Sequence, residues 1–287
     1  MGFHYNAPAS MSELLSGIKN ADNCYFLAGG TDLVVKIKEG LIAPEFVVDL
    51  GKIKELREIA DAGLVIIIGA TVTHSQLQKS PLIKKYAAVL ASAAGQVGSP
   101  QIRNVGTVGG NICNASPVAD TSPALLVLDG VVEVKGVNGN RNIPLKDFFV
   151  RPAVTVLEKG EFVTSIYIKK VQPGEGASFQ KIGKRKALAI SVTNAAVWLK
   201  KDGDKIADIR IALGAVAAKT IRIPAVEDQL KGLVFDQSVA SKAGELAKAS
   251  VKPITDLRST ADYRADVVDV IVEQAMCEAW AQAKGGN

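Results

Sequence analysis

The sequence predicts an α+β fold that is divided into more than one subdomain. The chain has 287 residues, which exceeds the length that one hydrophobic core usually serves. Hydrophobic residues make up 48% of it and aromatic residues only 5%, so Ala, Val, Ile and Leu must fill a core of helices packed on sheets. Apolar runs alternate with helical patterns at first, and consecutive strand patterns follow after residue 176. These features exclude a disordered or low-complexity chain.

The first 70 residues are expected to form a small α/β unit. Apolar residues recur at helical spacing over residues 9–20, and residues 24–28 form the continuous apolar run of a buried parallel strand. This run leads into Gly29-Gly30-Thr31-Asp32, and an apolar pattern resumes over residues 33–38, so we predict a strand, a turn and a helix. The other elements predicted for this unit are strands at residues 3–5, 46–50 and 63–70 and a short connection at residues 53–59.

A second α/β unit is expected over residues 71–173. A capped helix begins near Thr73, and a longer, alanine-rich helix is predicted over residues 82–97. Residues 106–111 place two adjacent glycines after a Thr-Val pair, and we expect a turn whose backbone N–H groups approach a ligand oxygen. The remaining predicted elements are a helix that begins at Asp120, strands at residues 131–135 and 161–168, and a hairpin turn at residues 137–140.

A different pattern follows Pro173-Gly174, which is the best candidate for a domain boundary. Three antiparallel strands are predicted at residues 178–181, 191–199 and 206–213, and helices at residues 225–230, 239–249 and 259–284. We therefore expect one domain at residues 1–173, with lobes at about 1–70 and 71–173, and a second domain at residues 174–287.

Positive charge is not gathered into a face that would bind nucleic acid. The formal net charge is +5, but Lys and Arg are interspersed with Asp and Glu along the whole chain, as on a solvated surface. The densest positive stretch, residues 181–186, is short and lies between apolar strands. We interpret it as an exposed turn or as a contact with an anionic cofactor, and no nucleic-acid partner is expected.

Neither a metal centre nor a membrane span is expected in this chain. Cys24, Cys113 and Cys277 are far apart and form no CxxC motif, and His4 and His74 are too few for zinc or non-haem iron catalysis. The first eight residues carry no charged segment followed by an apolar run, and no apolar stretch reaches the length of a membrane span. We expect free thiols and a soluble, cytoplasmic protein.

The two glycine loops, residues 27–33 and 106–111, suggest one extended ligand gripped from two sides, and a dinucleotide has the appropriate length. Neither loop matches the GxGxxG of the dinucleotide-binding βαβ fold or the GxxxxGK[ST] of nucleotide triphosphatases, and both lack lysine. Paired glycines at strand ends are more often plain turns. The motif Ala-Gly-Gly-Thr-Asp is therefore weak by itself.

Three motifs occur along the chain in the same order as in a known protein family. They are residues 28–33 (AGGTDL), residues 101–112 (QIRNVGTVGGNI), and residues 181–185 (KIGKR) with residues 189–192 (AISV). Together they closely resemble the FAD-binding medium subunit of molybdenum hydroxylases, the xanthine dehydrogenase and carbon monoxide dehydrogenase family, over essentially the whole chain. The resemblance implies a two-lobed FAD-binding domain of the vanillyl-alcohol-oxidase type, followed by a carbon monoxide dehydrogenase flavoprotein-type C-terminal α+β domain.

The resemblance also implies that FAD is bound non-covalently and indicates which residues would contact it. Residues 28–33 and 107–111 would contact the diphosphate and the neighbouring ribityl or ribose groups. Asp120 would bind polar groups of FAD, and Val163 would contact the cofactor through its backbone. Lys181 would lie near the flavin ring. The full set is Leu27, Ala28, Gly29, Gly30, Thr31, Asp32, Leu33, Thr107, Val108, Gly109, Gly110, Asn111, Asp120, Val163 and Lys181.

Simpler roles stay open for three of the charged residues. Lys181 is alternatively a surface lysine, Asp120 a helix cap, and Arg103 an anion contact or a surface ion-pair partner. Residues 188–190 match a segment that lies over the isoalloxazine face in relatives, but no aromatic residue occurs there. What covers the flavin ring is therefore left open.

The function implied by the resemblance is that of an electron relay, an FAD-dependent oxidoreductase subunit with no catalytic residue for substrate hydroxylation. Electrons would come from a molybdenum cofactor in a large subunit through [2Fe-2S] clusters in a small subunit to FAD, and then to NAD or another acceptor. The complex would be a dimer of heterotrimers. The alternatives are a stand-alone flavin reductase of the same superfamily, for which we find no proton-donor motif, and a non-catalytic assembly module.

Overall fold

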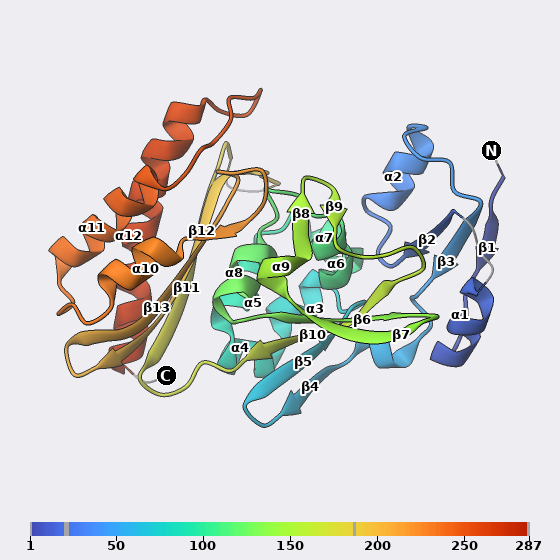
Figure 1. Cartoon of the computed structure of the whole chain (residues 1–287), viewed down its shortest axis with the longest axis horizontal. Helices are drawn as coiled ribbons and strands as arrows, with labels where there is room; N and C mark the ends of the chain where they lie inside the picture. The colour runs from blue at the N-terminus through green and yellow to red at the C-terminus, as the bar shows by residue number, and fades with distance from the viewer. Residues whose placement is uncertain (1, 20–22, 186–187, 286–287) are drawn as a thin grey trace.

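The computed structural model describes residues 2–19, 23–185 and 188–285. Three sheets, each with its own helices, follow one another from the N-terminal end of the molecule to the C-terminal helices at the other end (Figure 1). The end of the helix predicted over residues 9–20 and Lys186 of the basic stretch lie outside the described residues.

The first lobe is a three-stranded parallel sheet with two helices. Its strands β1 (His4–Asn6), β3 (Phe46–Asp49) and β2 (Cys24–Leu27) lie in that order. Helix α1 (Met11–Ile18) packs Leu14 and Ile18 against β3, and α2 (Leu33–Lys38) follows β2 through the glycine loop. The predicted strand, turn and helix at this loop are confirmed.

The second lobe contains a five-stranded antiparallel sheet in the order β4-β5-β10-β6-β7. Its strands are β4 (Ile59–Ala62), β5 (Val65–Gly69), β10 (Phe162–Lys169), β6 (Val131–Gly136) and β7 (Gly139–Pro144), and a short 3-10 turn, η1 (Lys54–Arg57), precedes them. The chain thus leaves the first sheet before β4, so the sheets divide earlier than the expected lobe boundary near residue 70. The predicted hairpin between β6 and β7 is confirmed.

Short helices cover this second sheet. They are α3 (His74–Lys79), α4 (Pro81–Tyr86), α5 (Ala88–Gly95), α6 (Pro100–Val105), α7 (Val108–Cys113), α8 (Thr121–Val127) and α9 (Leu145–Phe148), and the small hairpin of β8 (Phe149–Arg151) and β9 (Val154–Thr155) lies beside them. The prediction of one helix over residues 82–97 is wrong. Ala87 leaves the helical region, with φ −149° and ψ 45°, so α4 ends before it and α5 begins after it with most of its side chains buried.

The C-terminal domain is an antiparallel sheet with helices on one face. Strands β11 (Glu175–Gly183), β12 (Ser191–Asp202), β13 (Lys205–Gly214) and β14 (Ile221–Arg222) lie in sequence order, and α10 (Pro224–Leu230), α11 (Gln237–Ala249) and α12 (Ala261–Gly285) follow. The three predicted strands and three predicted helices are confirmed, and β14 is an addition. Within the described residues, no helix has both the length and the apolar composition needed to cross a membrane.

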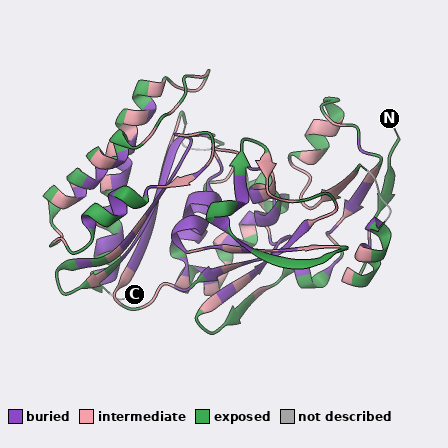
Figure 2. Cartoon of the chain, viewed as in Figure 1, coloured by how far each residue is buried: buried purple, intermediate pink, exposed green. Residues whose placement is uncertain are grey.

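Alternate residues of β12 enter two different cores. Ala196 and Trp198 belong to the core of the second lobe, whereas Val197 and Leu199 pack with α11 and α12. Both faces of the strand are therefore buried, as the purple centre of this sheet shows in Figure 2. Side chains alternate between the two faces of a strand, so one face of β12 packs on the second lobe while the other packs on the C-terminal helices. This packing holds the C-terminal domain against the second lobe.

Candidate functional site

A cleft of about 430 Å³ separates the two lobes and brings distant predicted residues together. We call it the first cleft. Its walls come from β2, from the start of α7 and from the segment that leads into β10. Four predicted site residues line it, namely Ala28, Gly109, Gly110 and Val163. The two glycine loops thus meet at one site, although about 80 residues of sequence separate them.

The close approach of the loops depends on Gly29. A Cβ atom on Gly29 would lie 2.1 Å from the carbonyl oxygen of Val105 and 2.9 Å from the Cα atom of Gly106. Only glycine fits in this contact. The following residue, Gly30, has φ +73°, which L side chains rarely adopt. Both glycines of the first loop are therefore required by the backbone geometry.

The first loop presents a row of unpaired backbone donors. In the described part of the chain, the N–H groups of residues 29–32 have no hydrogen-bond acceptor. These groups lead into the N-terminus of α2, where a helix leaves its first N–H groups unpaired. Consecutive free N–H groups at such a position suit an anion such as a diphosphate.

The second glycine loop differs from its prediction. Gly109 and Gly110 lie in the first turn of α7, and the hydroxyl of Thr107 caps this helix by accepting from the N–H of Gly110 at 3.1 Å. The N–H groups of Val108 and Gly109 donate to the carbonyls of Val72 and Ala70. The expectation that these N–H groups face a ligand is wrong, because protein acceptors occupy them. Residues 109–110 contribute wall surface to the cleft.

A polar bridge joins the two lobes beside the first cleft. Lys36 of α2 donates to the side-chain oxygen of Asn114 at 2.7 Å, and the amide of Asn114 donates to Asp32 at 3.0 Å. The bridge ties the end of α7 to the start of α2. It was missed from the sequence because Asn114 lies 82 residues from Asp32.

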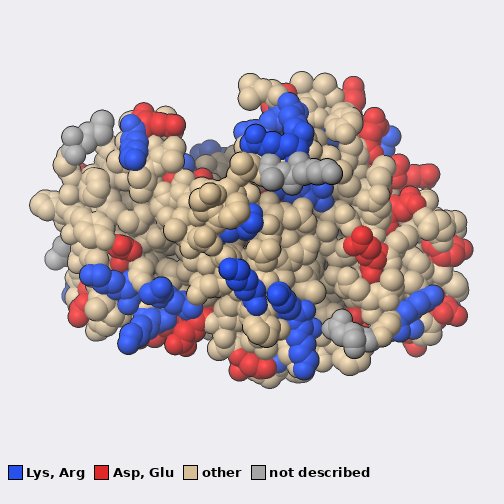
Figure 3. All heavy atoms as spheres, turned by 180° about the vertical axis from the view of Figure 1, so that it is seen from behind, with Lys and Arg blue, Asp and Glu red and all other residues tan. Residues whose placement is uncertain are grey.

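A second cleft, of about 620 Å³, lies between the α5–α6 connection and the turn after β11. Lys181 lines it together with Arg103, Lys184 and Arg185, and no carboxylate is among its lining residues in the described chain. Figure 3 shows one group of Lys and Arg side chains at the upper edge of the molecule and further groups spread along its lower part. Of the predicted site residues, four line the first cleft and Lys181 lines the second, whereas the other ten line neither. The stretch from α6 to α7 runs from one cleft to the other.

Asp120 and Lys181 form a buried ion pair. Their side chains are 8% and 4% exposed, and Lys181 Nζ lies 2.6 Å from Asp120 Oδ2. Ser191 donates to the other carboxylate oxygen at 2.6 Å, and Asn194 donates to it at 3.1 Å. The alternatives of a surface lysine and a helix cap are both excluded, because Lys181 is buried and the Asp120 side chain makes no cap hydrogen bond.

Burial raises the pKa of the Asp120 carboxyl, and Lys181, Ser191 and Asn194 oppose this rise by binding the charged form. Ser191 and Asn194 were missed as site residues. The only signal in the sequence was a cluster of polar residues, Ser191, Thr193 and Asn194, at the start of an apolar strand.

Arg103 and His74 contact the loops on either side of α6, Arg103 the loop before it and His74 the loop after it. The Arg103 guanidinium donates to the carbonyls of residues 97 and 98, at 3.0 and 3.2 Å, and also lines the second cleft, so its role as an anion contact stays a prediction. His74 is 2% exposed, and its ring would lie 3.4 Å from a Cβ atom on Gly106. Burial, with a contribution from Arg103, lowers the pKa of His74 to about 4, so the imidazole is neutral at pH 7.

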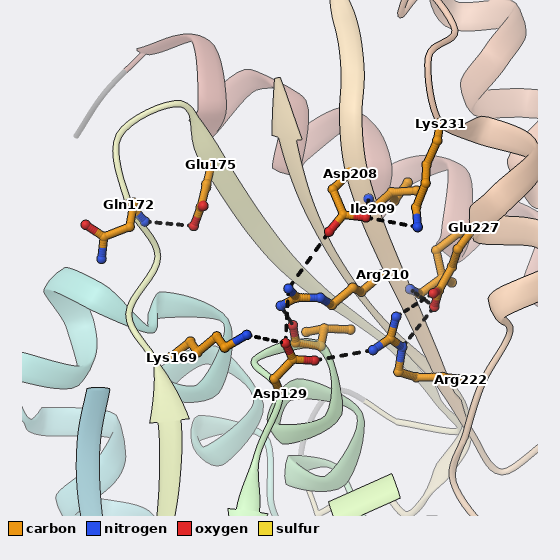
Figure 4. Close-up of polar contacts among 12 residues, drawn as sticks. Asp129, Lys169, Gln172, Glu175, Asp208, Ile209, Arg210, Arg222, Glu227 and Lys231 are labelled. Atoms are coloured by element: carbon orange, nitrogen blue, oxygen red, sulfur yellow. Dashed lines mark hydrogen bonds and ion pairs between the residues drawn. The ribbon is translucent and has the colours of Figure 1, made fainter. Parts of the chain in front are cut away.

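A cluster of charged side chains lies at the junction between the second lobe and the C-terminal domain (Figure 4). Asp129, which follows α8, pairs with Lys169 at 2.8 Å, with Arg210 at 3.1 Å and with Arg222 at 3.4 Å. Arg210 and Arg222 belong to the C-terminal domain, and the Arg210 guanidinium stacks 3.9 Å from the Trp198 ring centroid. One carboxylate thus holds the C-terminal sheet beside the second lobe.

Comparisons with known proteins agree with this architecture. The family "FAD binding domain in molybdopterin dehydrogenase" matches residues 1–169, and the family "CO dehydrogenase flavoprotein C-terminal domain" matches residues 178–279. The carbon monoxide dehydrogenase medium chain of Hydrogenophaga pseudoflava is 32% identical, with 98% of each chain covered. The nicotine 6-hydroxylase medium subunit of Paenarthrobacter nicotinovorans is 31% identical, with 97% of each chain covered.

A solved structure shows the same fold. A chain of the carbon monoxide dehydrogenase of Hydrogenophaga pseudoflava superposes with a TM-score of 0.94 at 32% identity, with 98% of each chain covered. Both domains of our chain therefore match in sequence and in structure. The chain belongs to the family of FAD-binding medium subunits of molybdenum hydroxylases, which includes the medium subunits of carbon monoxide dehydrogenase and xanthine dehydrogenase.

Proposed function

We propose that this chain is the electron-transfer subunit of a molybdenum dehydrogenase complex. Bound FAD would supply the redox chemistry that links the iron-sulfur clusters of a partner to NAD or another acceptor. The observation that carries the proposal is the row of free N–H groups at residues 29–32, which directly follows Ala28 in a cleft that Gly109 and Gly110 also line.

The two clefts suggest how the chain would hold the cofactor. Residues 27–33 would bind the diphosphate through backbone N–H groups, and residues 107–111 with Val163 would form the opposite wall. Lys181 would meet the flavin ring in the second cleft, where its ammonium favours the more negative, reduced ring. Residues 183–185, 188 and 189 also line that cleft.

The partners and the setting are part of the proposal. The chain would bind a large subunit with the molybdenum cofactor and a small subunit with [2Fe-2S] clusters, as a dimer of heterotrimers in the cytoplasm. Substrate hydroxylation would occur in the large subunit. The names "medium chain" and "medium subunit" of the relatives support the presence of a larger and a smaller partner.

The test is purification of the full-length chain with and without its genomic neighbours. We expect the isolated chain to bind one FAD and to show no hydroxylase activity, and the co-expressed complex to reduce its flavin when substrate is added. Mass spectrometry of co-purifying chains identifies the partners. A complex whose flavin resides in another subunit would refute the proposal, and NADPH oxidation by the isolated chain with reduction of a small molecule would favour the stand-alone reductase.

A further inference from the structure

One side of the first cleft is a connecting segment with little packing of its own. Residues 157–163, which we call the wall segment, lead from β9 into β10 and all line this cleft. Glu158 and Lys159 are exposed, and together with Glu161 they also line a smaller hollow of about 220 Å³ around the β6–β7 turn. The middle of the wall segment therefore borders open space on two sides, and packing alone holds it weakly.

The two ends of the wall segment are attached to different lobes. Leu157 packs against the core of the second lobe, whereas Phe162 belongs to the core of the first. The centroid of the Phe162 ring lies 5.1 Å from that of Phe26 on β2. The wall segment thus spans the opening between the lobes, and the residues between its ends need another support.

Arg141 supplies this support from the edge strand β7. Its guanidinium donates to both carboxylate oxygens of Glu161, at 2.9 and 2.7 Å, and to the carbonyl oxygen of Val156 at 2.9 Å. One of these Glu161 oxygens also accepts from the backbone N–H of Glu158 at 2.7 Å. The planar guanidinium presents its donors as a rigid fork, which the ammonium of a lysine cannot reproduce.

Glu161 passes this support to the backbone of the wall segment. Its side chain is 16% exposed, against 41% for Arg141, and the hydrogen bonds from the guanidinium lower the pKa of its carboxyl, so the pair is charged at neutral pH. Gly136, at the end of β6, leaves room for it, because a Cβ atom there would lie 3.3 Å from the Cγ atom of Glu161. These contacts form one clamp on residues 156–161.

We propose that the Arg141–Glu161 pair is a clamp that holds the wall segment closed on the bound cofactor. The proposed function, on which this inference rests, places the diphosphate at residues 27–33 and the flavin ring beside Lys181 in the second cleft. The adenosine end of FAD would then enter the first cleft. When the clamp is broken, the wall segment loosens and FAD leaves faster, while the surroundings of the ring stay the same.

The test compares FAD release from the full-length wild type, Arg141→Ala, Glu161→Gln and the double variant. We expect dissociation of FAD to be at least fivefold faster in each single variant and no faster still in the double variant, because both changes open the same clamp. The affinity for ADP, which carries the adenosine and the diphosphate but no ring, should fall by the same factor. The midpoint potential of the bound flavin should not change.

The matched control is Lys248→Ala. Lys248 is a similarly exposed cation, at 45%, and it pairs with Asp266 at 2.8 Å between α11 and α12, where neither residue lines either cleft. Its removal should leave FAD release, ADP affinity and the flavin potential as in the wild type. A general effect of losing one surface ion pair would instead appear in this variant as well.

A second readout needs no flavin. Trypsin cleavage after Lys159, followed by mass spectrometry of the FAD-free chain, should be at least tenfold faster in Arg141→Ala and Glu161→Gln than in the wild type or in Lys248→Ala. Arg141→Lys keeps the charge but loses the fork, so its cleavage and FAD release should lie between those of the wild type and Arg141→Ala. It decides the question if Arg141→Ala does not fold.

The outcomes separate this inference from the proposed function. Faster cleavage after Lys159 with unchanged FAD release would show that the clamp does not act on the cofactor, and would overturn the inference. Unchanged cleavage and release would also overturn it, as would faster FAD release with unchanged ADP affinity, because the effect would then lie at the ring. If the wild type binds no FAD, the proposed function fails, while the cleavage rates still show whether Arg141 holds the wall segment.

Discussion

Gly109 lies against Ala70 so closely that a Cβ atom on Gly109 would come within 2.5 Å of the Ala70 carbonyl oxygen. The next residue, Gly110, is exposed, and a Cβ atom there would meet only the Thr107 hydroxyl, at 3.0 Å. Both glycines line the first cleft. Gly109 is therefore required for packing α7 on β5, whereas Gly110 borders the space that the ligand is proposed to fill.

The two glycines predict different variant behaviour. Gly110→Leu should lower FAD occupancy at least tenfold with little change in stability, because its side chain enters the cleft. Gly109→Leu should destabilise the fold by about 3 kcal/mol or more, because it displaces backbone at Ala70. The flavin-to-protein absorbance ratio and chemical denaturation measure these effects. Full flavin content in Gly110→Leu would contradict the placement of FAD in this cleft.

Local patterns were sufficient to predict most elements, but long-range packing decided several of them. Strands β11, β12 and β13 follow from apolar runs separated by turn residues, and the structure contains all three. The break at Ala87 could not be predicted, because alanine is the strongest helix former and only tertiary packing turns the chain there. Likewise, β4 and β5 join the second sheet through the pairing of β5 with β10, about 100 residues later.

The sequence indicated which loops would border the site, but it did not show which of their backbone and side-chain groups are free to bind a ligand. Ala28 of the first glycine loop lies in the same cleft as Gly109 and Gly110 of the second, and the binding of FAD there stays a prediction. Which N–H groups remain free depends on the carbonyls of Ala70 and Val72, which no local pattern links to α7. The partner of Lys181 was also hidden, since Asp120 lies 61 residues away and the two meet only across the domain junction.

His74 should make the protein sensitive to acid. Its pKa in the folded chain is about 4, against about 6.5 when unfolded, so the unfolded chain binds the proton more readily. Stability is therefore complete above pH 6.5 and falls as the pH is lowered toward 4, by up to about 3 kcal/mol. Denaturation at pH 7 and pH 4.5 should show a clearly smaller loss for His74→Gln than for the wild type. Equal losses would mean that other groups govern the acid sensitivity.

Asp129 should hold the two domains together more strongly than its neighbour Asp208. Asp129→Ala leaves Lys169, Arg210 and Arg222 without their shared carboxylate, and we expect a loss of about 1–3 kcal/mol that shrinks at high salt. Asp208→Ala removes a more exposed partner of Lys231 and should cost less than about 1 kcal/mol. Thermal unfolding at two salt concentrations measures both. Similar losses in the two variants would contradict a special role of Asp129.

Cys24 and Cys277 offer a direct test of which cleft the cofactor fills. Cys24 lines the first cleft, whereas Cys277 lies on α12 in the C-terminal domain and lines neither cleft. Burial raises the pKa of both thiols, so both react slowly at neutral pH and their rates can be followed by mass spectrometry. Bound FAD should slow alkylation of Cys24 by iodoacetamide at least fivefold, because it excludes the reagent from the cleft, and leave the rate at Cys277 unchanged. If FAD binds but both thiols react as fast as in the FAD-free chain, the cofactor does not occupy the first cleft, and Ala28, Gly109 and Gly110, which line it, cannot be its contacts.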